Sequence, residues 1–464
     1  AEPITTTMLT SDGRPLEITH GDSIIRFTFD AFGRPAEEIQ SGDGGVTSAR
    51  LTYGYHNTGP RASAAVWLDS TSGGGSQTLV STAQYEIDGA GRVIWQQLDF
   101  DGDDDSAWVG AVGSDKLLHF EREYEGLGAV VRVNRYESKT PDAGSERGKS
   151  RYMYRDSGLL TTIVHESAAG NTIASNGAAY DGATGSLESR HFDPFDSSGT
   201  FMASLPPVVS YSVGNDGTPA MTDDVILDVD ARGNRSDERD IDGNRLMEDP
   251  AFKYRYDVEG RVIEKTALVE WDVTMTSESG FTWKVGDTFQ YEWDLRDRLT
   301  KIRLNGDEMV IEYAYDGLNR IISRTYSEED PANDQQIYYV YDGGQVILEL
   351  EAGQQIRRAW MYSAENGHAV AVDESAYDSP TVWLYPDSAG TVRSLGRIDD
   401  NGVWRVAHQL FTIEGLPIEF VGETSDQQLA GVPVVWNGIP LDADANLYGT
   451  GSTAYDPLSG RALS

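Results

Sequence analysis

The sequence has no cysteine among its 464 residues. Disulfides, thiolate zinc sites and cysteine nucleophiles are therefore excluded. No apolar run approaches the ~18–20 residues of a membrane span, so we expect no direct insertion into a membrane. Positive charge is scarce, because 37 Lys and Arg stand against 75 Asp and Glu and the formal net charge is −38. Such a chain repels phosphate backbones, so we expect no nucleic-acid partner.

The composition that remains predicts a folded β-protein. Hydrophobic residues make up 39% of the chain, which supplies enough apolar material for a core. Aromatic residues reach 10%, with 23 Tyr, and there are 49 Gly. Tyrosine favours strands and glycine favours tight turns, while helix signals are nearly absent. We therefore predict an all-β chain.

The first residues and the charge bear on location. The chain begins with Ala1, Glu2 and Pro3 rather than Met. We interpret this as the start of a chain whose signal peptide was removed, or of a fragment excised from a longer chain. Strong acidity is typical of proteins kept soluble in salty or extracellular settings. We expect a secreted or cell-surface protein.

One pattern recurs along the chain: aromatic, any residue, aromatic, Asp, two residues, Gly or Asn, Arg. The clearest copies span 254–261, 291–298 and 313–320, and the copy at 339–344 loses the Arg. Degenerate copies lie upstream at 27–34 and 85–92, and the chain closes with another at 455–461. The predicted repeat residues are Tyr254, Tyr256, Asp257, Gly260, Arg261, Tyr291, Asp294, Arg298, Tyr313, Tyr315, Asp316, Arg320, Tyr339, Tyr341, Asp342, Tyr455, Asp456, Gly460 and Arg461.

Each copy is a β-hairpin signal. Tyr254 and Tyr256 are two residues apart, so they share one face of a strand. Asp257 suits the first turn position, where its carboxylate accepts a local backbone N–H, and Gly260 supplies the positive φ that closes the turn. Arg261 opens the returning strand, where it can pair with the turn Asp or stack on a Tyr ring. The repeat thus specifies shape, with no chemistry attached.

These copies resemble the YD-repeat, or Rhs (rearrangement hotspot), proteins. The resemblance is strong over 225–464 and weaker before it, so we divide the chain into an irregular β-rich region, 1–224, and a YD-repeat region, 225–464, that ends in an Rhs core-like segment. The resemblance implies a β-hairpin ribbon wound into an open spiral or solenoid. In bacterial toxins of the family the ribbon encloses a C-terminal toxic domain, and in other members it serves as a cell-surface or adhesive scaffold.

Two acidic clusters are candidate calcium sites, because carboxylates and amide oxygens are the ligands that Ca²⁺ prefers. The first cluster comprises Asp99, Asp101, Asp103, Asp104 and Asp105. The second comprises Asp442, Asp444 and Asn446. Neither cluster has the full spacing of a helix-loop-helix calcium loop, and a solvated loop is the alternative. We expect no other cofactor.

The leading functional prediction is a non-enzymatic secreted or cell-surface β-scaffold, which self-assembles into a fibre or acts in adhesion to surface proteins or glycans. Open strand edges, which favour pairing with another chain, motivate self-association. The alternative is the proteolysed core of an Rhs-type shell around a C-terminal toxin, if the chain is a fragment of a longer one. A glycan-active enzyme is a further alternative, since the many Asp and Glu pairs do not exclude a carboxylate dyad.

Overall fold

The computed structural model describes most of the chain, and all regular structure in that part is β-strand. Among the same residues we find no helix with the length and hydropathy that a membrane crossing requires. The described ranges are 5–42, 48–69, 77–99, 117–126, 128–138, 144–180, 187–202, 211–213, 219–221, 240–242, 245–249, 251–272, 282–328, 334–364, 366–373, 381–398, 404–411, 415, 417–422, 434–449 and 453–464.

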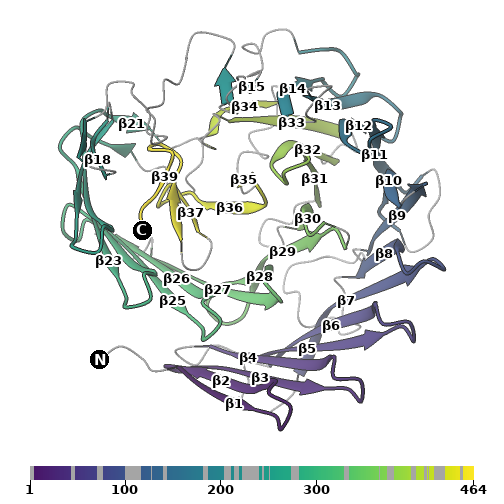
Figure 1. The fold of residues 1–464 in the computed structure, drawn as a ribbon, viewed down its shortest axis with the longest axis horizontal. Helices are drawn as coiled ribbons and strands as arrows, with labels where there is room; N and C mark the ends of the chain where they lie inside the picture. Colours follow the sequence, from purple (N-terminus) through teal and green to yellow (C-terminus); the bar gives the residue numbers. More distant parts are fainter. Residues whose placement is uncertain are drawn as a thin grey trace.

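The first sheet has 16 strands, and each strand pairs antiparallel with the next one along the chain. Figure 1 shows it as a curved band that follows the rim of the molecule from β1 round to β15. Its strands are β1 (Thr5–Leu9), β2 (Pro15–His20), β3 (Ser23–Phe29), β4 (Pro35–Ser41), β5 (Ser48–Tyr55), β6 (Arg61–Asp69), β7 (Gln77–Ile87), β8 (Val93–Asp99), β9 (Leu117–Glu125), β10 (Ala129–Tyr136), β11 (Glu146–Tyr154), β12 (Leu160–Glu166), β13 (Thr172–Tyr180), β14 (Leu187–Pro194), β15 (Tyr211–Val213) and β16 (Pro219–Met221).

The second sheet also has 16 antiparallel strands in near-continuous chain order. A separate two-stranded hairpin, β21 (Trp271–Asp272) with β22 (Thr282–Trp283), interrupts the order between β20 and β23. The strands are β17 (Asp240–Asp242), β18 (Arg245–Glu248), β19 (Phe252–Tyr256), β20 (Val262–Ala267), β23 (Thr288–Trp293), β24 (Leu299–Leu304), β25 (Met309–Tyr315), β26 (Ile321–Glu328), β27 (Gln335–Asp342), β28 (Gln345–Leu350), β29 (Ile356–Tyr362), β30 (Ala369–Asp373), β31 (Val382–Pro386), β32 (Val392–Ile398), β33 (Trp404–Phe411) and β34 (Pro417–Gly422).

A small C-terminal sheet of five strands lies inside the curve of the second sheet (Figure 1). Its residues Leu447, Ala454 and Leu463 share a buried cluster with β18 to β26, and Val435 packs with β29 to β33. Its strands are β35 (Val435–Trp436), β36 (Ile439–Asp442), β37 (Leu447–Gly449), β38 (Ala454–Asp456) and β39 (Arg461–Ala462).

Strand burial shows how many layers cover each sheet. In β19, Phe252 and Tyr254 are buried while Lys253 and Arg255 are exposed, which is the alternation of a sheet with one covered face. In contrast, every residue of β30 and of β31 is buried. This part of the second sheet has the first sheet on one face and the C-terminal sheet on the other.

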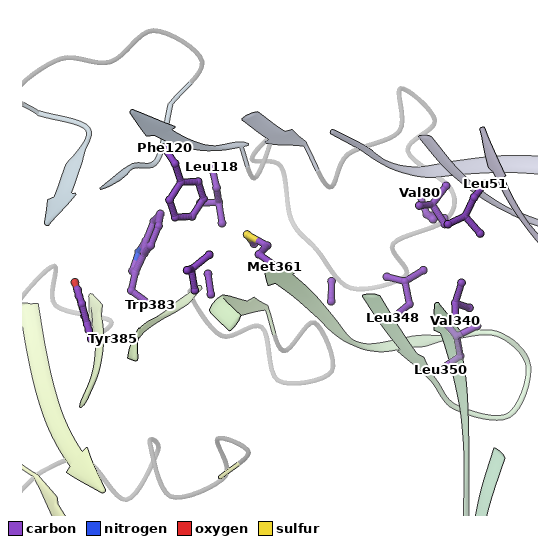
Figure 2. Close-up of a cluster of buried hydrophobic side chains, with 14 of the residues drawn as sticks. Leu51, Val80, Leu118, Phe120, Val340, Leu348, Leu350, Met361, Trp383 and Tyr385 are labelled. Atoms are coloured by element: carbon purple, nitrogen blue, oxygen red, sulfur yellow. The ribbon is translucent and has the colours of Figure 1, made fainter. Parts of the chain in front are cut away.

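A continuous apolar seam joins the first and second sheets. One buried cluster takes Leu51, Val66 and Phe120 from the first sheet and Val340, Leu348 and Trp383 from the second. Figure 2 shows Leu51 and Phe120 of the first sheet facing Val340, Leu348 and Trp383 of the second sheet. The Phe120 and Trp383 rings lie with their centroids 5.6 Å apart. Burying such large side chains is the main favourable contribution to holding the layers together.

The prediction of an all-β fold is confirmed, with large, open antiparallel sheets. The division at residue 224 stays a prediction. The first sheet ends at Met221 and the second begins at Asp240.

Candidate functional site

The repeat turns share one hydrogen-bond pattern. In the copy at 294–298, Oδ1 of Asp294 accepts the backbone N–H groups of Arg296 and Arg298. Its Oδ2 accepts Nε–H of Arg298 at 2.5 Å, and the Asp294 N–H bonds to the Arg298 carbonyl. One carboxylate therefore closes the turn and fixes the arginine. The same three side-chain acceptor roles recur at Asp30, Asp88 and Asp316. They recur at Asp257 too, with the N–H of Gly260 in place of the N–H two residues after the Asp.

The residue before each arginine adopts a positive φ, which explains the Gly or Asn in the pattern. The φ angle is 98° at Gly260 and 65° at Asn319. Asp297 takes this position in a third copy with a φ of 59°. Glycine reaches this region without strain, and Asn and Asp are the side chains that tolerate it best.

Each turn is also tied to the next hairpin. The Arg298 guanidinium lies 4.6 Å from the Tyr315 ring centroid, and Nη1 donates to the Asp316 carbonyl. The Tyr315 hydroxyl donates back to the Leu299 carbonyl at 2.7 Å. Arg320 and Tyr341 repeat this arrangement one hairpin later. A similar return bond from a tyrosine hydroxyl occurs at Tyr55, Tyr124, Tyr154, Tyr180 and Tyr256.

The first tyrosine of two copies donates a hydrogen bond to a nearby carboxylate. Tyr254 is buried and its hydroxyl donates to Asp249 at 2.7 Å. Tyr313 donates to Asp442 of the C-terminal sheet at 2.6 Å. Burial, together with these carboxylates, raises the pKa of both hydroxyls far above the usual value. Burial also raises the pKa of Tyr291 and of Tyr339, so these tyrosines are neutral packing groups.

Two copies without an arginine four residues after the Asp obtain a cation from a distant part of the chain. Asp342 binds Nη1 and Nη2 of Arg61, which belongs to the first sheet, and also accepts the Tyr53 hydroxyl. In the last copy Arg461 lies five residues after Asp456, opposite it in the β38–β39 ladder. Oδ2 of Asp456 bonds to Nζ of Lys265 at 3.2 Å.

The Lys265–Asp456 pair is deeply buried, with side-chain exposures of 4% and 0%. Burial disfavours the ammonium, but the Asp456 carboxylate more than offsets this and the pKa of Lys265 is raised. The Lys265 ammonium also lies 4.1 Å from the Phe252 ring centroid. This pair anchors the last repeat to the second sheet.

A second buried ion cluster holds the same C-terminal sheet. Arg324 of β26 bonds to Asp442 at 2.7 and 3.0 Å and to Asp444 at 2.5 Å. The Arg324 side chain is only 6% exposed. Burial opposes its charge, but the two carboxylates raise its pKa well above the usual value. The Asp442–Asp444 pair, which we predicted as a calcium site with Asn446, thus binds a guanidinium.

Most residues of the other candidate calcium site lie outside the described part of the chain. Asp99 closes β8, while Asp101, Asp103, Asp104 and Asp105 are outside the described residues. Within the described ranges, no three His, Asp or Glu side chains gather as a metal site would require. The calcium prediction for the first cluster stays a prediction.

A cavity of about 380 Å³ lies in the seam between the two sheets. Tyr85 and Gln96 line it from the first sheet, and Gln345 and Trp360 line it from the second. The amide of Gln96 bonds to the Tyr362 carbonyl and to the Ala364 N–H, and the amide of Gln345 bonds to the Gly367 carbonyl. These side-chain bonds bridge the seam and connect the loops at its edge.

No family model matches the chain. A curated protein of Dickeya dadantii, the probable deoxyribonuclease RhsA, is 23% identical over 398 residues, which is 81% of this chain and 26% of the relative. The chain thus spans about a quarter of the length of this relative.

Two of the solved structures to which the chain is similar are Tc toxins. A TcdB2–TccC3 crystal structure without its hypervariable C-terminal region is 13% identical over 99% of this chain and 27% of that one, with a TM-score of 0.37. A Tc holotoxin pore of Photorhabdus luminescens gives 13% identity, 98% and 26% coverage and a TM-score of 0.38.

The name of the Dickeya relative contradicts our prediction that the protein is not an enzyme, and that prediction is wrong as it stands. It was drawn from a repeat whose residues build turns. Such residues report on the fold and carry no information on an activity located elsewhere in a long polypeptide.

The repeat turns and the Dickeya relative both indicate a similarity to Rhs proteins. The Asp, the left-handed residue and the Arg of the pattern form the same bonded turn at positions as far apart as Asp30 and Asp316. The relative carries the Rhs name and aligns along four-fifths of this chain. The chain is thus similar to an Rhs protein along most of its length, and its repeat turns have the YD pattern.

Proposed function

We propose that this chain is a stretch of wall from an Rhs-type shell that encloses a toxin domain, built as a β-ribbon wound into an open spiral. The observation that carries the proposal is the order of contacts between the two sheets. His20 of β2 meets Arg298, which precedes β24, and Arg61 of β6 meets Asp342 of β27. Farther along, Gln96 of β8 bonds to Tyr362 of β29.

This order continues to the end of both sheets, where His408 of β33 bonds to the Phe195 carbonyl just beyond β14. In a spiral ribbon the second turn lies against the inner face of the first turn. Later strands of one sheet then contact later strands of the other, which is the order found here. The apolar cluster between the two sheets holds these two layers together. A shell built from such a wall encloses a toxin domain without a specific binding site for it.

The charge of the chain suits a cationic cargo. The formal net charge is −38, and a domain that cleaves DNA needs a basic surface for the phosphate backbone. An acidic wall attracts such a domain and competes with its substrate. We propose that nucleic acid is excluded from the wall itself, that any nuclease belongs to the whole protein, and that the assembly acts outside the cell that makes it.

The test uses the full parent polypeptide. We expect trypsin to spare the enclosed domain and DNA cleavage to be latent until mild denaturant opens the shell. A parent variant with Asp294→Ala and Asp316→Ala, which lose two turn anchors, is expected to release activity at lower denaturant than a variant with Asp12→Ala, an exposed acid. Full nuclease activity of the intact, protease-accessible parent would contradict the shell.

A second candidate is self-assembly through an open sheet edge. Strand β1 is an edge strand of the first sheet, and Met8 and Leu9 on it are 60% and 56% exposed. Exposed edges with apolar side chains favour pairing with another chain. Sedimentation velocity of the chain tests this, since Met8→Lys should abolish any dimer or fibre, and a monomer at all concentrations would contradict it.

A further inference from the structure

Three buried histidines lie where the first and second sheets touch. They are His20 on β2, His165 on β12 and His408 on β33, and each is 5% exposed or less. Each is bonded through Nδ1 to a hydroxyl on the neighbouring strand, namely Thr5, Ser150 and Ser394 at 2.9, 2.7 and 2.9 Å. Each also contacts the opposite sheet. The same side-chain pair therefore recurs at three points along one seam.

The contacts of His20 require an uncharged imidazole. Nη2 of Arg298 lies 3.0 Å from Nε2, and a guanidinium only donates, so Nε2 accepts and carries no proton. Arg296 lies close by and bonds to Thr5. The facing acids, Asp294 and Asp316, are bound by Arg298 and Arg320. A proton on His20 would face Arg298 directly.

His165 belongs to a buried chain of hydrogen bonds that ends on a guanidinium. Nη1 of Arg135 donates to Oγ of Ser150 at 2.7 Å, and Oγ of Ser150 lies 2.7 Å from Nδ1 of His165. Tyr385 of the second sheet covers both groups, with its ring centroid 5.1 Å from the His165 ring and 4.8 Å from the Arg135 guanidinium. The adjacent acid, Glu166, is bound by Arg151. Protonation would place a second cation beneath Tyr385.

His408 bridges the layers with both nitrogens occupied. Nε2 donates to the Phe195 carbonyl at 2.9 Å, so Nδ1 must accept from the Ser394 hydroxyl. The ring packs on Phe192, and the Arg393 guanidinium also contacts the Phe192 ring. Asp387, the acid of that region, is bound by Arg393. No described ion pair offers His408 a carboxylate of its own.

We propose that the seam is an acid-operated latch, which opens on acidification when protons enter His20, His165 and His408. Protonation removes the Nε2 lone pair of His20 that accepts from Arg298, and it forces the Ser394 hydroxyl to reverse its bond to Nδ1 of His408. It also sets a second cation beside the guanidinium at His20 and at His165. As a means of releasing cargo the latch rests on the proposed shell, but as a property of this fold it stands alone. The two sheets part while their own strand ladders stay paired.

Burial agrees with this direction. It lowers the pKa of all three groups, with Arg298 adding to the effect at His20 and Arg135 at His165. The pKa of His408 falls to about 4. An opened seam returns each imidazole toward its ordinary pKa of 6.5, so acid drives opening.

The absence of native cysteine permits a clean test on this chain alone. Ala371→Cys places one thiol in the seam, and Ala267→Cys places one in the separate cluster under the C-terminal sheet. Both alanines are 1% exposed or less. Labelling with a dipyridyl disulfide, which reacts in acid, is followed from pH 7 to about pH 4 while far-ultraviolet circular dichroism monitors the strands.

We expect the seam thiol to react at least about tenfold faster at the acid end, with the control thiol protected and the strand signal unchanged. Adding His165→Gln and His408→Gln should move the midpoint to lower pH by about one unit, whereas His191→Gln, an exposed histidine, should not. A seam thiol that stays protected, or a control thiol exposed at the same midpoint, overturns the latch. Because no cargo is present, neither result bears on whether the chain encloses one.

Discussion

Replacing Arg324 with methionine should release the C-terminal sheet from the second sheet. Methionine keeps much of the volume but removes the bonds that Arg324 makes to Asp442 and Asp444, whose side chains are 17% and 10% exposed. Breaking a buried pair from one side leaves uncompensated charge and typically costs about 3–5 kcal/mol. Two carboxylates lose their cation here, so we expect about 4 kcal/mol of lost unfolding free energy.

The matched control is Arg255→Met, which removes a surface bond to Glu264 from an arginine whose side chain is 67% exposed. Exposed pairs contribute less than about 1 kcal/mol, so this variant should unfold almost as the parent does. Urea denaturation gives the free energies, and hydrogen exchange shows whether residues 434–464 lose protection first. Equal losses in the two variants, or unchanged protection of 434–464 in Arg324→Met, would refute the anchoring role.

Three other predictions follow from the same geometry. Asp294→Ala strands two backbone N–H groups and a guanidinium and should cost about 3 kcal/mol by denaturation, with a smaller loss for the more exposed Asp88→Ala; equal losses would contradict the turn account. Gly148→Ala puts a Cβ 2.6 Å from the Glu166 carbonyl oxygen and should cost about 2–3 kcal/mol, whereas Gly89→Ala has open space and should be neutral. Because burial lowers the pKa of His408 from 6.5 to about 4, its contribution is complete above pH 6.5 and falls by about 3 kcal/mol as the pH drops toward 4. His408→Gln should flatten this part of the stability profile, and an unchanged slope would refute the assignment.

The sequence by itself determined the turns and therefore the hairpins. Asp257, Gly260 and Arg261 lie within five residues, and all the bonds that close the turn form among them. Local geometry of this kind depends on spacing and side-chain type, which is why the repeat could be recognised from residues alone. Antiparallel pairing of consecutive strands follows from the turns, because each one reverses the chain.

Only the tertiary structure decided which repeats meet. Asp342 has no arginine of its own repeat and obtains Arg61 from 281 residues away, and Asp456 obtains Lys265 from 191 residues away. Neither ion pair can be recognised from the spacing of residues along the sequence. Each pair depends on how far the sheets curve before they overlap. The same curvature buries β30 and β31 on both faces and brings three Thr/Ser–His pairs to one seam. Small twists that add up over sixteen strands set that curvature, and no single repeat encodes it.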